Sequence, residues 1–233
     1  MLKPKKSKKT SVKATGLNFE LGKISPMTVN QQKVFDLYTS GKNLVLYGSA
    51  GSGKSFLSLY LGLKEMLDEG TFNKIVIIRN ILPVRDVGFL KGSLDEKIQP
   101  LSLPYVEIVN DLFNRDDAFS ILTQKRIIEF TSTSYLRGLT YNDALIIVDE
   151  IQNLTFHELD TVFSRVGENS KIILCGDYKQ YDISKKEVSG FYDIMKIVDK
   201  MHSEFVTAEF TTDDIVRSGF VKSYLIAKNN LGF

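Results

Sequence analysis

The chain has 233 residues and a formal net charge of +2, with 43% hydrophobic and 25% charged residues. This length suggests one compact domain, and the composition is ordinary for a globular protein. No apolar stretch approaches the roughly 18 residues that a membrane span needs, and the single cysteine, Cys175, excludes an internal disulfide, so we expect a cytoplasmic protein without membrane contact.

The amino terminus is strongly basic. The first ten residues hold five lysines and no acid. We interpret residues 1–16 as a basic disordered tail, or alternatively as a non-specific contact for a nucleic-acid backbone. The tail lacks the apolar segment of a signal peptide. Residues 17–233 are expected to form a single folded domain.

Helical and strand patterns alternate along this domain. The expected helices are residues 27–38, with Thr28 as N-cap, 55–69, ended by Gly70, 105–114, 155–166, 188–200 and 213–228. The expected strands are residues 43–47, 74–79, 126–131, 144–148, 171–175 and 204–210. Residues 82–104 contain several prolines and glycines and are expected to form a long, loop-rich connection.

Strands that are apolar throughout and separated by helices predict an α/β fold, with a mostly parallel sheet and helices on both faces. Such sheets bind ligands at the carboxyl ends of their strands. The residues that follow each strand are therefore the candidates for chemistry.

The segment after the first strand satisfies the phosphate-binding pattern G-x-x-x-x-G-K-[ST] in full. Its backbone N–H groups and the helix that follows can surround phosphate oxygens. Lys54 is expected to reach the β- and γ-phosphates, and the Ser55 hydroxyl to bind Mg²⁺. The predicted nucleotide-binding residues of this P-loop are Gly48, Ser49, Ala50, Gly51, Ser52, Gly53, Lys54 and Ser55.

A second motif follows the apolar strand at residues 144–148. Asp149 and Glu150 end this strand, as in a Walker B motif. We expect Asp149 to hold Mg²⁺, and Glu150 to orient or deprotonate the attacking water.

Two glutamines are further candidates. Gln180 follows the next apolar strand, where it could sense the γ-phosphate, although the segment could also be a plain turn. Gln31 precedes the P-loop strand and could bond the edge of adenine. A solvated helix start is the alternative for Gln31.

The order of these motifs resembles superfamily 1 helicases, and more closely the PhoH-like family. The resemblance covers residue 27 to the carboxyl terminus. The further matching segments are residues 88–97, similar to G-F-L-P-G-x-L-x-E-K, 135–140, similar to Y-x-R-G-R-T, 148–153, similar to L-D-E-A-Q-N, 176–180, similar to G-D-x-x-Q, and 214–217, similar to D-V-V-R.

This resemblance implies a RecA-like P-loop ATPase that uses ATP and Mg²⁺, assembles into rings such as hexamers, and acts on RNA. In a ring, Arg217 is the candidate arginine finger for a neighbour's γ-phosphate, with a surface arginine as the alternative. Leu139 and Lys91 depart from the family pattern. The residues before the match are too few for the PIN-type nuclease domain of some family members, so no RNA cleavage is expected. The short form resembles phage-encoded members, which implies the host bacterial cytoplasm.

Polar side chains that follow the strands could grip RNA or single-stranded DNA. Arginine pairs with phosphate, and an aromatic ring can stack on a base. The candidates are Arg79, Arg85, Lys91, Tyr135 and Arg137. Structural ion pairs are the alternative for the arginines.

Three functions are compatible with these residues. The leading hypothesis is an ATPase that couples hydrolysis to translocation on, or remodelling of, RNA or single-stranded DNA. The second is a non-motor ATP-dependent switch that assembles or recruits a partner. A small-molecule kinase is the third, and the chain shows no arginine-rich lid for it.

Overall fold

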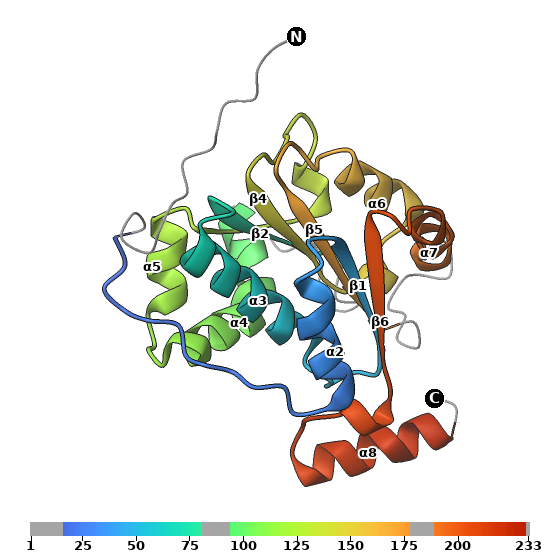
Figure 1. Cartoon of the computed structure of the whole chain (residues 1–233). Coiled ribbons are helices and arrows are strands. Elements are labelled where there is room, and N and C mark those ends of the chain that lie inside the picture. The colour runs from blue at the N-terminus through green and yellow to red at the C-terminus, as the bar shows by residue number, and fades with distance from the viewer. Residues whose placement is uncertain (1–15, 81–93, 178–188, 232–233) are drawn as a thin grey trace.

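The computed structural model describes residues 16–80, 94–177 and 189–231 (Figure 1). The helices are α2 (Val29–Tyr38), α3 (Lys54–Glu69), α4 (Leu94–Phe113), α5 (Ala118–Gln124), α6 (Phe156–Phe163), α7 (Phe191–Lys200) and α8 (Gly219–Asn230). The strands are β1 (Asn43–Gly48), β2 (Lys74–Ile78), β3 (Ile128–Thr131), β4 (Ala144–Val148), β5 (Lys171–Gly176) and β6 (Phe205–Phe210). Short 3-10 helices are η1 (Thr133–Tyr135), η2 (Ile151–Asn153) and η3 (Thr212–Asp214).

Within the described part of the chain the strands form one six-stranded sheet in the order β3-β2-β4-β5-β1-β6. Every neighbouring pair is parallel. β1 lies between β5 and β6, so the chain must cross over two strand positions to reach β2, and the winding direction reverses beside β1. Ligands of open parallel sheets bind at such a switch point, outside the carboxyl ends of the strands.

The two faces of the sheet bury alternate residues of each strand, because successive strand side chains point to opposite faces. In β1, Leu44 and Leu46 pack with α2, α3, α4 and α5, whereas Val45 packs on the other face with α6 and α7. Figure 1 shows these two helical layers on either side of the strands. The prediction of a parallel α/β sheet covered on both faces is confirmed.

The start of α2 and the end of α3 lie at the residues that the sequence predicts. The Thr28 side chain caps α2 by accepting a hydrogen bond from the Gln31 N–H. Gly70 ends α3 in the left-handed conformation, with φ of 66°, which glycine adopts at little cost. Both predicted boundaries are confirmed.

The long connection predicted for residues 82–104 is partly wrong, because α4 already begins at Leu94 and contains Pro100 and Pro104. Proline removes a helical hydrogen bond. Both prolines lie on the exposed face of α4, where water can bond the carbonyls that lose their partners. Burial of Tyr105 and Val109 on the opposite face stabilises the helix.

Two further helices differ from the prediction. α5 was not expected, and α8 begins at Gly219 instead of residue 213. Asp214 is buried, and its Oδ2 accepts hydrogen bonds from the Thr211 N–H (2.8 Å) and the Asn30 side chain (2.7 Å). These bonds fix η3 against the start of α2, so the chain turns before α8 can begin.

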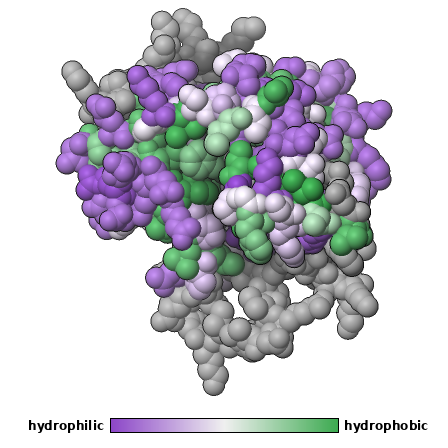
Figure 2. Space-filling view, turned by 90° about the horizontal axis from the view of Figure 1, so that it is seen from below, coloured by the Kyte–Doolittle hydropathy of each residue, from purple (hydrophilic) through white to green (hydrophobic). Residues whose placement is uncertain are grey.

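α8 lies apart from the sheet, at the end of the molecule where the strands terminate (Figure 1). None of its side chains that the structure describes is buried. Phe220 and Tyr224 are 83% and 59% exposed. Seen from the side of α8, hydrophobic surface lies among polar residues (Figure 2).

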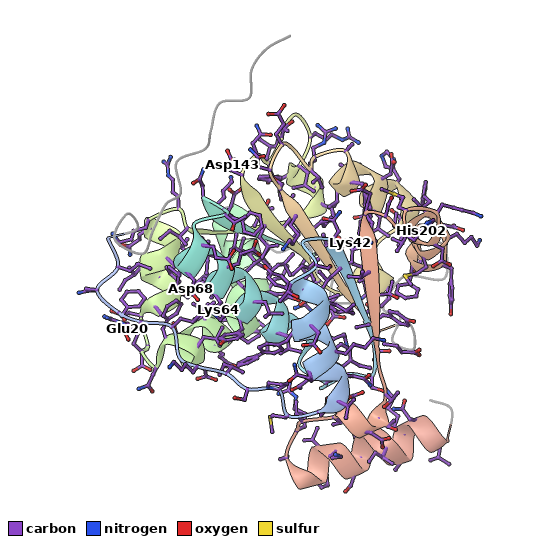
Figure 3. All side chains as sticks on the ribbon, in the orientation of Figure 1. Glu20, Lys42, Lys64, Asp68, Asp143 and His202 are labelled. Carbon is purple, nitrogen blue, oxygen red and sulfur yellow. The ribbon has the colours of Figure 1, made fainter. Side chains whose placement is uncertain are left out.

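The opposite edge of the sheet holds the amino ends of the strands. Asp143, just before β4, lies at this edge, far from α8 (Figure 3). Lys42 precedes β1, and its Nζ donates to the His202 carbonyl ahead of β6 (3.0 Å). The residues of the candidate site lie at the other, carboxyl edge.

Candidate nucleotide site

The P-loop joins β1 to α3 in a conformation that requires glycine. Gly48 has φ of 114°, and a Cβ at this position would come within 2.0 Å of the Phe210 carbonyl oxygen. The Ser49 N–H donates to the same carbonyl (3.0 Å). Gly53, with φ of 87°, precedes the first turn of α3. The loop therefore lies at the N-terminus of α3, where the positive end of the helix dipole favours a bound anion.

The Lys54 side chain bends back over this loop. Its Nζ donates to the carbonyl oxygens of Gly48 (2.8 Å) and Ser49 (2.9 Å). Burial lowers the pKa of Lys54, and the negative charges of Asp177 and Asp149 oppose this effect. A phosphate can therefore replace the carbonyls as partner and supply a full negative charge to a partly desolvated ammonium group.

The P-loop and the Walker B strand meet at one hydrogen bond. Ser55 Oγ donates to Asp149 Oδ2 at 2.8 Å, although the two residues lie 94 positions apart. The Asp149 N–H donates to the Ile78 carbonyl (2.9 Å), which extends the pairing of β4 with β2. Hydroxyl and carboxylate oxygens are the ligands that Mg²⁺ prefers, and phosphate oxygens and water can complete its octahedron. The two residues that the sequence assigns to the metal thus fit it.

Tyr105 is a member of this site that the sequence reasoning missed. Its hydroxyl, on α4, donates to the same Asp149 Oδ2 (2.8 Å). Tyr105 is 1% exposed. Burial and the Asp149 charge raise its pKa well above the usual value, so the hydroxyl keeps its proton and remains a donor. No local motif marks a tyrosine whose partner lies 44 residues away.

Replacing Tyr105 by phenylalanine should weaken Mg²⁺-dependent nucleotide binding. The Asp149 carboxylate loses one of the two side-chain donors that it has among the described residues. Groups that orient a metal ligand typically contribute about 10–100-fold to metal affinity. The measurement is the Mg²⁺ concentration needed for half-maximal binding of a fluorescent ATP analogue. Tyr135→Phe, at an exposed tyrosine, is the matched control. An unchanged Mg²⁺ requirement in Tyr105→Phe contradicts this role.

Glu150 has a strained backbone. Its φ of 55° and ψ of 43° lie in the left-handed region, which costs a residue with a side chain of the order of 1 kcal/mol. Burial and the neighbouring Asp149 raise its pKa, whereas a hydrogen bond from Gln152 and the positive charge of Arg79 lower it. Such strain and opposed electrostatic effects are typical of a catalytic carboxylate.

Gln31 is buried beside the P-loop and uses both ends of its amide. Oε1 accepts from the Met27 N–H (2.8 Å), and Nε2 donates to the Ser52 carbonyl (3.0 Å). The paired bonds to adenine that the sequence suggests would have to use the second lone pair of Oε1 and the second N–H of Nε2, or displace these contacts. Adenine recognition by Gln31 therefore stays a prediction, and the structure adds a second role, which is to hold α2 against the P-loop.

Arg217 lies against the P-loop of its own chain. The Val216 N–H donates to the Gly51 carbonyl (3.0 Å). A Cβ placed on Gly51 would lie 2.9 Å from Arg217 Cγ and 3.6 Å from its Nε. The guanidinium group of the predicted finger is thus close to the phosphate loop within one subunit.

The sequence of the chain matches the model of the family described as PhoH-like protein over residues 23–228. The chain belongs to the PhoH-like family. Protein PhoH2 of Bacillus subtilis is 41% identical over 143 residues, which are 60% of this chain and 32% of the relative. A PhoH-like protein of Mycobacterium tuberculosis (strain H37Rv) is 31% identical over 208 residues, 88% of this chain and 57% of the relative. The chain therefore spans 32% and 57% of the lengths of these two curated relatives.

The fold of this PhoH-like protein also occurs in solved structures. The large terminase of a thermophilic bacteriophage superimposes with a TM-score of 0.54 over 86% of this chain and 50% of the terminase, at 15% sequence identity. At this identity the likeness shows the fold alone, and it supports the predicted RecA-like P-loop NTPase architecture.

The nucleic-acid candidates separate into two groups. Arg79 is half-buried at the end of β2, and its charge acts on Glu150 and Tyr105. Tyr135 and Arg137 are exposed beyond β3, at the same edge of the sheet. Arg85, Lys91 and Gln180 lie outside the described residues. Among the helices that the structure describes, none has the length and apolar character to span a membrane.

Proposed function

We propose that this PhoH-like protein binds ATP with Mg²⁺ and hydrolyses it, and that hydrolysis drives translocation on, or remodelling of, RNA or single-stranded DNA. The observation that carries the ATPase assignment is the 2.8 Å contact between Ser55 Oγ and Asp149 Oδ2. It joins the two motifs of a phosphoryl-transfer site at the switch point of the sheet.

The residues of the site have distinct roles in this proposal. Lys54 binds the β- and γ-phosphates and stabilises the charge that develops during transfer. Glu150 orients the water and accepts its proton as the water oxygen attacks the γ-phosphorus. The bond from the γ-phosphorus to the bridging oxygen breaks, and ADP and phosphate leave. Ser55 and Asp149 would hold Mg²⁺, which would supply positive charge opposite the phosphates.

The nucleic-acid part of the proposal rests on the carboxyl edge of the sheet. Tyr135 is 44% exposed and Arg137 is exposed close by, which provides an aromatic ring and a cation for a single strand. Arg79 lies between this surface and Glu150, because β2 is the strand between β3 and β4. A single-stranded nucleic acid bound beyond β3 can therefore act on the Glu150 carboxylate through Arg79.

ATP turnover with a panel of single-stranded RNA, single-stranded DNA and duplexes tests the proposal. We expect ATP turnover to rise when single-stranded RNA or DNA is added. Binding of that nucleic acid should weaken steeply between about 50 and 200 mM salt. Arg137→Ala should reduce the stimulation, whereas Lys196→Ala, which removes an exposed charge on α7, should not. Turnover without stimulation, together with no salt-sensitive binding, leaves an ATPase but contradicts the coupling.

α8 favours a second candidate function, a nucleotide-dependent switch. A helix of this length without buried residues is marginally stable alone, and its exposed aromatic residues are available to a partner. Because Arg217 precedes α8 and lies against the P-loop, nucleotide binding can reposition the helix. The molecular mass with and without a non-hydrolysable ATP analogue separates the candidates. A ring motor predicts an assembly of several copies, and a monomer in both states contradicts it.

Mixed assemblies can also show whether Arg217 acts within its own subunit or on a neighbouring one. We propose that it acts on the nucleotide of its own subunit, since its side chain packs on Gly51 of the same chain. Mixing Arg217→Ala with Lys54→Ala subunits tests this. An arginine that acts across the subunit boundary restores turnover in mixed rings, because the Lys54→Ala subunit supplies it. An arginine that acts within its own subunit restores none.

A further inference from the structure

Gln152 connects Glu150, which the proposed reaction uses, with the backbone at the end of β5. It lies in η2, between the end of β4 and the end of β5, and is 1% exposed. Its Nε2 donates to Glu150 Oε2 at 2.5 Å, and its Oε1 accepts from the Asp177 N–H at 2.9 Å. One buried amide therefore joins the catalytic carboxylate to the backbone that follows β5.

We propose that Gln152 is a positioning residue that holds the Glu150 carboxylate and makes its position depend on the backbone at Asp177. The proposal rests on the ATPase function above, and it adds a defined link between the site of water attack and the backbone at the end of β5. A displacement of the Asp177 backbone moves Gln152, and Gln152 moves Glu150.

The packing around Gln152 leaves it little freedom. A Cβ on Gly176 would lie 2.6 Å from Ile151 Cγ1 and 3.1 Å from Gln152 Oε1, so the end of β5 approaches η2 as closely as a glycine allows. Ile151 is fully buried. A displacement of β5 therefore reaches the amide by direct contact, because close-packed interiors transmit strain.

The chemistry of the link requires an amide. A carboxylate of the same length accepts from the Asp177 N–H but has no proton to donate to Glu150 when ionised. A methionine of similar length makes neither bond. Gln152→Glu and Gln152→Met therefore separate the two halves of the link at nearly constant side-chain volume.

Both variants should lose turnover and keep nucleotide binding. We expect kcat to fall by about 10–100-fold, the range for removal of a group that orients a catalytic or ligating side chain, with the affinity for a fluorescent ATP analogue unchanged. Gln124→Met, at an exposed glutamine of α5 that bonds only Ser120 within the described contacts, is the matched control. Unchanged turnover, or equal losses of turnover and affinity, overturns the positioning role.

Amide hydrogen exchange at Asp177 tests the link without reference to activity. Gln152→Met should exchange about tenfold faster at this amide, which corresponds to one lost hydrogen bond, whereas Gln152→Glu should retain the wild-type rate. Glu150→Ala, which removes the partner that fixes Gln152, should also accelerate exchange, and Glu168→Ala should not. If the wild type lacks ATPase activity but these rates hold, the function is wrong and the link stands. Equal rates in all variants overturn the link.

Discussion

ATP turnover should fall by about 10²–10⁴-fold in Glu150→Gln, the usual contribution of general acid–base catalysis. Glutamine has nearly the shape of glutamate but cannot accept a proton from the attacking water. Removal of a negative charge from the phosphate site should not weaken binding of the negatively charged nucleotide. Turnover is measured as phosphate release, and binding as the affinity for a fluorescent ATP analogue.

Glu168→Gln is the control for this change. Glu168 is exposed ahead of β5, at the opposite edge of the sheet, and its substitution should leave turnover and binding at wild-type values. If Glu150→Gln retains turnover, then Glu150 does not orient the water. Gln180, which lies outside the described residues, would then be the next sequence candidate.

Lys54→Ala should lose both nucleotide binding and turnover. The Nζ group, which now bonds two P-loop carbonyls, is the cation that we assign to the β- and γ-phosphates. Removing one partner of a buried, hydrogen-bonded charge pair costs about 2–5 kcal/mol, and each 1.4 kcal/mol is about tenfold in affinity. Equilibrium titration with the fluorescent analogue in the presence of Mg²⁺ provides the measurement.

Lys64→Ala is the matched control on the same helix. Lys64 pairs with Asp68 on the exposed face of α3, well away from the P-loop (Figure 3). Exposed pairs of this kind contribute little, so this variant should bind nucleotide normally. Normal binding by Lys54→Ala, in a variant with wild-type circular dichroism, would exclude the P-loop as the main phosphate contact.

The sheet could be predicted from the sequence because its four central strands, β2, β4, β5 and β1, are short, mainly apolar runs that are largely buried on both faces. The edge strands β3 and β6 keep partly exposed polar residues. The structure places the boundaries of all six strands within about two residues of the prediction. The first half of α4 could not be predicted, because Pro100 and Pro104 usually indicate the end of a helix. Their effect depends on whether the helix face that carries them meets water or the core, and this follows only from the tertiary structure.

Some residues of the nucleotide site could likewise be predicted from the sequence, whereas others could not. Gly48, Lys54 and Asp149 could be predicted because the P-loop and the strand end impose their residue types locally. Tyr105 and Gln152 could not, since a buried hydroxyl or amide finds its partner through the packing of distant segments. Arg217 was selected by resemblance, and its contact with Gly51 of the same chain appears only in the structure.

The position of β6 has a consequence for how the protein is made. β1 pairs along its whole length with β6, and the Phe210 carbonyl receives the Ser49 N–H at the start of the P-loop. During translation, the phosphate loop emerges long before the strand that supports it. A nascent chain therefore lacks a complete nucleotide site until β6 has left the ribosome. ATP can stabilise the finished domain by mass action, but it cannot guide the earlier stages of folding.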